Sequence, residues 1–159
     1  MTHPDHLHPD PHGGKPERAH RMALFARATS DELKQALDAL AEAATAQAVR
    51  GPETGLIMLR GRIGGGGNAF NLGEATVTRA TVRLANGAIG HGQRLGTDRE
   101  AARLAAIADA LGEAGGHEAA ITALLQTVGD RLSREETLLA QETAATRVDF
   151  FTLVRGEDQ

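Results

Sequence analysis

The hydrophobic positions repeat with a helical period at both ends of the chain and alternate in a stretch between them. Apolar residues recur three or four positions apart from about residue 17, which predicts a short helix over 17–28 and a longer one over 31–45. Thr29 and Glu32 have the spacing of a capping box at the start of the second helix. The chain is therefore predicted to begin with two helices.

Residues 47–96 have the alternation and the β-branched residues that are typical of strands. The pattern predicts strands over about 56–63, 74–84 and 88–95, with a further short strand around 69–72. Each predicted strand is bounded by glycine, asparagine or proline, which are the residues that form turns. This region is therefore predicted to be an antiparallel meander.

The last third of the chain returns to a helical pattern. A second capping box begins at Thr97, Gly115-Gly116 ends that helix, and two more helices are predicted over 117–128 and from 131 through Phe151. Helices, then strands, then helices predict an α+β domain. Its antiparallel sheet has three to five strands (about 47–96) and is flanked by N-terminal and C-terminal helices.

Three arginines in the predicted sheet are candidates for binding an anion. A two-residue turn at Asn86-Gly87 places Arg79 opposite Arg94 and Arg83 opposite Gly90. Side chains alternate along a strand, so these arginines share one face of the sheet. Like charges directly opposite each other are unfavourable unless an anion offsets them. Arg79, Arg83 and Arg94 are therefore the candidate anion-binding residues, and a solvated outer face is the alternative.

The end of the chain is a candidate interface with a partner. Phe150 and Phe151 are two of only four phenylalanines in a chain that has no tyrosine or tryptophan. Read as a helix, this segment is apolar on most sides, and such a helix is usually covered on most sides. We expect a partner chain to cover it, with docking on the chain's own core as the alternative. The candidate interface residues are Arg147, Val148, Asp149, Phe150, Phe151, Val154 and Arg155.

Residues 1–16 stand apart from the rest because they are rich in proline and histidine. Such a segment buries too little apolar surface to offset the entropy of ordering it, so we expect it to be disordered. Residues 17–159 are then a single domain, which is long enough for a hydrophobic core. The histidines of the tail are weak metal-binding candidates, since nothing fixes their geometry. They are His3, His6, His8 and His12.

Composition narrows the possible chemistry. The chain has no cysteine, which excludes disulfides, thiolate catalysis and thiolate metal sites. Its 17 basic residues are outnumbered by 21 acidic ones, which argues against binding nucleic acid through net charge. No apolar run approaches the roughly 18 residues of a membrane helix, so we expect a soluble cytoplasmic protein. The spacing reveals no nucleophile–base pair and no paired carboxylates, so we predict neither a catalytic residue nor a cofactor in this chain.

Several long motifs, in this order, resemble those of the PhnG family, the G subunit of the bacterial carbon–phosphorus lyase core complex. The resemblance covers about residues 18–158, and its most specific part is at the C-terminus. The motifs are Glu53–Leu56, Gly73–Leu84 followed by Asn86-Gly87, Leu95–Asp98, Ile107–Leu111 and Arg147–Gly156.

The resemblance implies a role in breaking down phosphonates for phosphorus supply. In that pathway the G, H, I and L subunits together make α-D-ribose 1-methylphosphonate 5-triphosphate by displacing adenine from ATP with an alkylphosphonate. The I subunit is regarded as the catalytic one. The J subunit then cleaves the carbon–phosphorus bond with S-adenosylmethionine and an iron–sulfur cluster. The implied partners are a symmetric, dimeric core of the G, H, I and J subunits, with K and L associating.

Three functions follow from these observations. The first is an accessory subunit without a cofactor of its own, which supports a partner transferase whose substrates are ATP and an alkylphosphonate. The second is a subunit that itself holds the triphosphate or phosphonate with Arg79 and Arg83. The third and weakest is a nucleic-acid-binding module on the basic sheet, which the absence of tyrosine and tryptophan disfavours.

Overall fold

The computed structural model describes residues 16–62 and 67–145 of the chain. One sheet contains three antiparallel strands in the order β1-β2-β3, and helices come before and after it in the sequence. The strands are β1 (Gln47–Gly61), β2 (Phe70–Arg83) and β3 (Ile89–Leu95). The helices are α1 (Pro16–Arg27), α2 (Ser30–Leu37), α3 (Ala41–Ala44), α4 (Arg99–Ala114) and α5 (Glu118–Ala145). The predicted α+β class, with an antiparallel sheet between two sets of helices, is confirmed.

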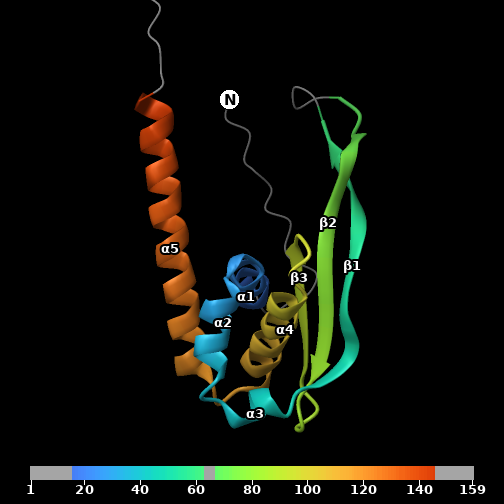
Figure 1. Cartoon of the computed structure of the whole chain (residues 1–159), viewed down its shortest axis with the longest axis vertical. Coiled ribbons are helices and arrows are strands. Elements are labelled where there is room, and N and C mark those ends of the chain that lie inside the picture. Colours follow the sequence, from blue (N-terminus) through green and yellow to red (C-terminus); the bar gives the residue numbers. More distant parts are fainter. Residues whose placement is uncertain (1–15, 63–66, 146–159) are drawn as a thin grey trace, which may run out of the picture.

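The described part of the molecule consists of a body and two arms (Figure 1). The β arm comprises residues 54–61 of β1 and 70–76 of β2, none of which is buried. The helical arm comprises residues 133–144 of α5, all of which are exposed. Both arms extend past the body on the same side of the molecule.

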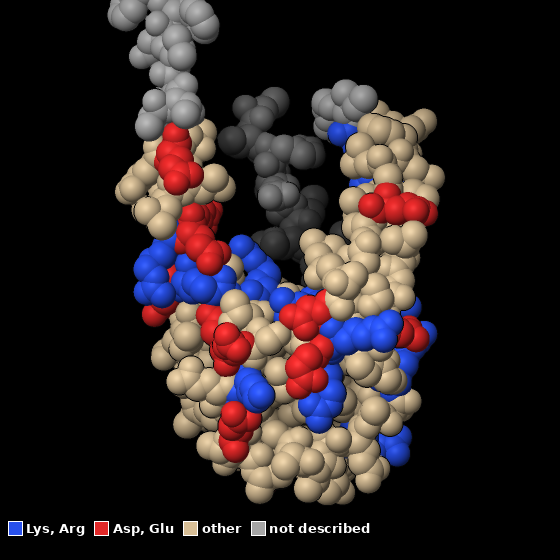
Figure 2. All heavy atoms as spheres, viewed as in Figure 1, with Lys and Arg blue, Asp and Glu red and all other residues tan. Residues whose placement is uncertain are grey.

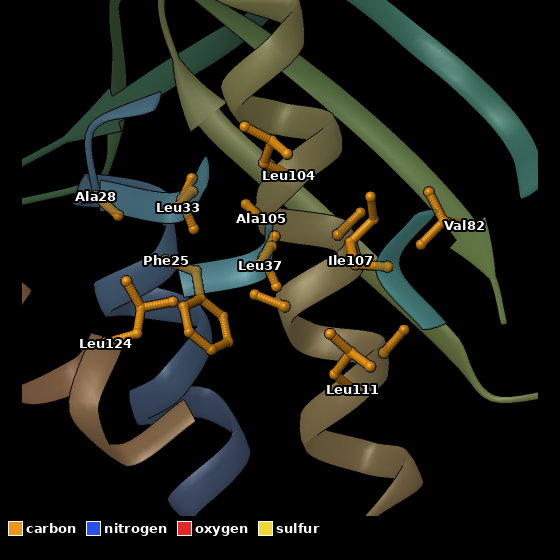
Figure 3. Packing of buried hydrophobic residues seen from close by; sticks show 14 of the residues in the cluster. Phe25, Ala28, Leu33, Leu37, Val82, Leu104, Ala105, Ile107, Leu111 and Leu124 are labelled. Atoms are coloured by element: carbon orange, nitrogen blue, oxygen red, sulfur yellow. The ribbon is translucent and has the colours of Figure 1, made fainter. Parts of the chain in front are cut away.

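Helix α4 is the centre of the body. Its buried residues occupy almost the whole circumference of the helix, which is the pattern of a helix covered on all sides. Figure 3 shows Val82 of β2 on one side of α4, with Phe25, Leu33, Leu37 and Leu124 of the other helices on the opposite side. The core is therefore two layers of side chains that share one helix.

Helix α4 can lie very close to β3 because that strand has glycine at two positions that face the helix. A Cβ atom at Gly90 would clash with the backbone of Ala106 and Ala110, and one at Gly92 with the backbone of Ala102 and Ala106. The helix contributes only alanine at these contacts, so small residues on both elements set the short separation.

Two predicted helices have different limits in the structure. The helix expected over 31–45 is divided into α2 and α3, and the division allows both Leu37 and Ala43 to be buried in the core. The helices expected over 117–128 and from 131 are one continuous helix, α5. The buried Val128 and the half-buried Leu132 hold α5 against the body on either side of Gly129.

The helix starts also differ in one case. Thr29 and Glu32 form the predicted capping box, with both of its hydrogen bonds present. At the start of α4, however, Asp98 is the N-cap instead of Thr97, and its carboxylate accepts a hydrogen bond from the backbone N–H of Ala101 at 2.9 Å. Aspartate is at least as good an N-cap as threonine, so the prediction is wrong by one residue.

The first strand is longer than predicted. It begins at Gln47 instead of residue 56, and irregular pairing near Val49 and Pro52 hides its alternation. Proline is tolerated there because β1 is an edge strand. The short strand expected around 69–72 is the first part of β2.

The predicted register between β2 and β3 is wrong by one residue. The backbone N–H of Gly87 donates to the carbonyl of Leu84, and the N–H of Leu84 donates to the carbonyl of Ala88, both at 2.9 Å. The loop therefore has three residues, and Gly87 adopts a φ of 89°. Arg79 consequently lies opposite Gln93, and not opposite Arg94.

We predict that Gly90→Ala or Gly92→Ala strongly destabilises the protein. The added methyl group has to push α4 away from the sheet, because the atoms it meets belong to the helix backbone. The expected loss in the free energy of unfolding is about 3 kcal/mol, measured by urea denaturation. Gly55→Ala is the matched control, since a Cβ at Gly55 meets nothing within 4 Å. Equal stability of the Gly90 and Gly55 variants would contradict the close approach.

Candidate functional site

A basic face lies on the side of the sheet away from α4. Ala80 and Val82 of β2 point into the core, so their neighbours Arg79 and Arg83 point the other way. Thr81 lies between them and is paired with residues on both flanking strands. The basic face is defined here as Arg50, Arg79, Arg83 and His91.

One carboxylate lies within this basic face. Oε1 of Glu53 is 2.7 Å from Nη2 of Arg50 and 3.1 Å from Nη2 of Arg79. The side chain of Arg83 makes no hydrogen bond or ion pair with the residues that the structure describes. Arg50 and Arg79 therefore share one acid while Arg83 has none, and the excess positive charge remains available to an anion.

The basic face is an open surface and not a pocket. The side chains of Arg50 and Arg79 are 58% and 47% exposed, so water screens their charge. His91 contributes a ring whose Nδ1 is 3.2 Å from the hydroxyl oxygen of Thr81. Such a surface can hold an extended anion through several weak contacts, but it does not exclude water as a catalytic site does.

Arg94 does not belong to the basic face. The corrected register pairs it with Thr78, on the side of the sheet that faces the helices. Its Nη1 donates a hydrogen bond to the carbonyl oxygen of Ala28 at 2.9 Å, just beyond the end of α1. Its Nε is buried and has no hydrogen-bond partner among the described residues. Arg94 therefore joins the helices to the sheet, and the predicted trio of arginines on one face is wrong.

Asp109 is an important polar residue whose partners the sequence did not reveal. It is fully buried in the middle of α4, and both of its oxygens accept hydrogen bonds from Arg18, at 3.1 and 2.7 Å. Its Oδ2 also accepts a hydrogen bond from the backbone N–H of His91 at 2.9 Å. The hydrogen bonds that Arg18 donates to Asp109 raise the pKa of Arg18, although burial opposes that shift. Asp109 thus fixes α1, α4 and β3 to one another.

A second ion pair fixes the base of the helical arm. Nε of Arg131 lies 2.7 Å from Oε1 of Glu32, and its Nη2 donates to the carbonyl oxygen of Arg27 at 2.8 Å. The Oε2 of the same Glu32 accepts a hydrogen bond of 2.8 Å from the backbone N–H of Thr29 in the capping box. The Arg131 guanidinium holds the pKa of Glu32 below its usual value, and Glu32 in turn raises the pKa of Arg131.

The arms carry most of the exposed apolar side chains. Seven of the ten large apolar side chains that are exposed in the described residues lie on the arms, five on the β arm and two on the helical arm. Leu56 and Leu139, one on each arm, are 63% and 64% exposed. Figure 2 shows uncharged surface interrupted by acidic patches on both arms, with many of the basic side chains gathered where the arms join the body. The seven residues are Leu56, Met58, Leu59, Phe70, Leu72, Leu138 and Leu139.

Two sets of predicted residues lie outside the described residues. They are the C-terminal interface candidates between Arg147 and Arg155, and the histidines between His3 and His12. Within residues 16–62 and 67–145, no three histidine, aspartate or glutamate side chains are grouped as a metal ion would require. The helices in those ranges also include none that is long and apolar enough to cross a membrane.

Comparison with known proteins identifies the family. Residues 16–156 match the family described as phosphonate metabolism protein PhnG. A protein of Rhizobium meliloti (strain 1021) named alpha-D-ribose 1-methylphosphonate 5-triphosphate synthase subunit PhnG is 59% identical over 145 residues. The matched region spans 91% of this chain and 93% of that relative.

The chain belongs to the PhnG family.

Two of the PhnG-like motifs of the sequence coincide with the centre of the structure. The motif over 73–84 covers most of β2. One face of this strand carries the basic face, and the other carries the buried residues that pack against α4. The motif over 107–111 is the buried middle of α4 and contains Asp109. In this member of the PhnG family, these two motifs therefore lie mainly in the body, while the motif over 147–156 lies outside the described residues.

We predict that Glu32→Gln lowers stability and weakens its dependence on acid. The folded-state pKa of Glu32 is depressed, so its contribution is present above the unfolded pKa and is lost as the pH falls through the folded pKa. The variant should lose about 1–2 kcal/mol near pH 7 and show a shallower decline between about pH 5 and pH 3. Urea denaturation at a series of pH values measures both effects.

Glu135→Gln is the control for this prediction. Its carboxylate is 57% exposed and contacts the same Arg131 through Nη1 at 2.9 Å. An exposed pair of this kind contributes less than about 0.5 kcal/mol. If the free energy of unfolding of Glu32→Gln falls with pH as steeply as that of the wild type, Glu32 is not the group that causes the loss of stability in acid.

Proposed function

We propose that this chain is an accessory subunit of the synthase that makes α-D-ribose 1-alkylphosphonate 5-triphosphate. In this proposal a partner subunit displaces adenine from ATP with an alkylphosphonate, and this chain organises and supports that partner. The relative from Rhizobium meliloti is itself named as a subunit of such a synthase, and family membership extends the role to this chain. No cofactor is proposed for this subunit.

The observation that carries the proposal is the pair of arms with exposed apolar side chains. Large side chains such as Leu56 and Leu139 gain roughly 1.5–3 kcal/mol each when they are fully buried, which a solitary chain forgoes. Exposed apolar patches are typical of surfaces that contact another protein. The buried core contains no residue of either arm, because it lies between α4, the base of the sheet and the other helices. The arms are therefore available for assembly without weakening the core.

The proposed interface also includes the segment after α5. Arg147, Val148, Asp149, Phe150 and Phe151 follow the helical arm in the sequence, and Val154 and Arg155 come shortly after. The apolar members Val148, Phe150, Phe151 and Val154, together with Leu138 and Leu139, make this part of the chain rich in apolar residues. The proposed partners are the other subunits of the carbon–phosphorus lyase core, H, I and J, with K and L associating, in a dimeric arrangement.

Co-expression of this chain with the other subunits tests the proposal. The double variant Leu138→Glu/Leu139→Glu should reduce co-purification at least about tenfold, because charge at an apolar contact is costly to desolvate. The matched control is Thr137→Glu/Gln141→Glu, which adds the same charge on another side of the same exposed helix. Phe150→Ala/Phe151→Ala should also weaken assembly. Full co-purification of all variants, or a chain that turns over substrate alone, would contradict the proposal.

A second candidate function is that this subunit holds part of the triphosphate or phosphonate on its basic face. It is favoured by Arg50 and Arg79, which share one carboxylate, and in particular by the Arg83 side chain, which is unpaired among the described residues. Arginine is well suited to phosphate oxygens because its planar group donates two parallel hydrogen bonds. This function is compatible with the first, since the anion could be shared with a partner.

Calorimetry with ATP tests this second function. If it is correct, the purified chain binds ATP at about millimolar concentration, and Arg79→Ala/Arg83→Ala weakens binding about tenfold or more. Arg103→Ala is the control, since Arg103 is a partly exposed arginine of α4 that pairs only loosely with Glu100, at 3.7 Å. No heat of binding from the wild type, or equal effects of the two variants, would eliminate the basic face as a phosphate site.

A further inference from the structure

The strand β1 has one side that is not paired. In the sheet order β1-β2-β3 it is an edge strand, and its ladder with β2 is regular from Glu53 to Leu59. Edge strands present N–H and C=O groups that can pair with another chain, so proteins usually cover or interrupt them. The open edge of β1 is therefore available to pair with another chain.

The backbone groups that point outward can be assigned from the neighbouring ladder. The N–H of Gly96 donates to the carbonyl of Thr76, and the N–H of Leu84 donates to the carbonyl of Ala88. The even-numbered residues of β2 therefore direct their backbone N–H and C=O groups toward β3. Hydrogen bonding alternates along an antiparallel strand, so the odd-numbered residues of β2, such as Val77 and Ala75, face β1.

The partners of those odd residues on β1 are Gly55 and Ile57. These residues therefore direct their backbone groups toward β2. The residues between and beside them, Thr54, Leu56 and Met58, direct their N–H and C=O groups to the open side. The edge offers three consecutive outward donor–acceptor pairs, which is the template that an added strand uses.

Two other parts of the sheet perimeter are covered or interrupted. On β3, the outward N–H of His91 is taken by the buried carboxylate of Asp109 at 2.9 Å. At the base of β1, pairing is irregular between Ala48 and Glu53, and Pro52 removes one donor. The stretch 54–59 has no proline, no charged residue and no irregular pairing. The described residues therefore neither cover nor interrupt the open edge of β1 over residues 54–59, where the strand extends past the body.

Charge indicates what kind of chain fits this edge. Arg60 and Arg62 follow the apolar stretch, and neither forms an ion pair with the residues that the structure describes. A second copy of this chain cannot supply the missing acid. A symmetric antiparallel pairing centred on residues 56–58 sets Arg60 opposite Pro52, Thr54 or Leu56 of that copy, none of which is acidic. The complementary strand therefore comes from a different protein.

We propose that residues 54–59 of β1 accept a β-strand from another subunit of the synthase, so that the sheet gains a fourth strand. The incoming strand is apolar over about six residues and has a carboxylate at the end beside Arg60 and Arg62. This inference rests on the proposed role as an assembly subunit and states how one arm makes its contact.

The test compares amide hydrogen exchange in the free chain and in the complex purified after co-expression with the other subunits. The outward amides of Leu56 and Met58 should exchange freely in the free chain and slow at least about 100-fold in the complex. The inward amides of Gly55 and Ile57 should be protected in both states. This alternation is specific to strand addition, since coverage by side chains alone does not select every second amide.

Two substitutions provide an independent readout. Leu56→Pro removes an outward N–H without removing a bond to β2, and should weaken assembly about 30-fold or more. Leu56→Val keeps the N–H and most of the apolar surface, and should change assembly less than about threefold. If Leu56→Pro does not fold, Arg60→Glu/Arg62→Glu replaces it and should also weaken assembly, in contrast to Arg103→Glu on α4.

The outcomes separate this inference from the proposed function. If the wild-type chain fails to assemble with the other subunits, the proposed function is wrong. If it assembles but the Leu56 and Met58 amides still exchange freely and Leu56→Pro assembles normally, only the strand addition is overturned. Protection of the same amides in a homodimer of the free chain would overturn it too, because the occupant would then be a second copy.

Discussion

The structure depends on how closely α4 approaches β3. Gly90 and Gly92 leave room for the helix backbone, and the alanines of α4 occupy that room. At this distance Asp109 reaches the backbone of His91 between the two glycines, and on its other side it binds Arg18 of α1. One close contact thus fixes the helix, the edge of the sheet and the N-terminal helix together, and the second core layer forms on the far side of α4.

This compact body explains why the arms can be apolar and exposed. The body buries its own core and anchors each arm at its base, through Arg131 and Glu32 for α5 and through the β1–β2 ladder for the β arm. In the proposed function, stability and assembly are therefore divided between different parts of the chain. A partner can bury Leu56 or Leu139 without competing with the contacts that keep the body folded.

The sequence predicted the element types well because the periodicities are strong, and it predicted most of α1, β2, β3 and α4 within a few residues. It failed where tertiary packing overrides local signals: Val128 and Leu132 carry α5 through Gly129, and the loop closed by Gly87 has three residues instead of two. That single residue moved Arg94 to the helix side. Arg50 was an unforeseen member of the basic face because β1 begins at Gln47 and not at residue 56. Arg18 could not be matched to Asp109 from sequence, since 91 residues separate them.

The uninterrupted course of α5 has a geometric consequence. Its twelve exposed residues, 133–144, rise about 1.5 Å each and carry the end of the helix about 18 Å past the body. A rigid rod of that length acts as a spacer, holding whatever binds its tip at a set height and rotation. Inserting one residue into it would turn the tip by about 100°, so its length matters as much as its side chains.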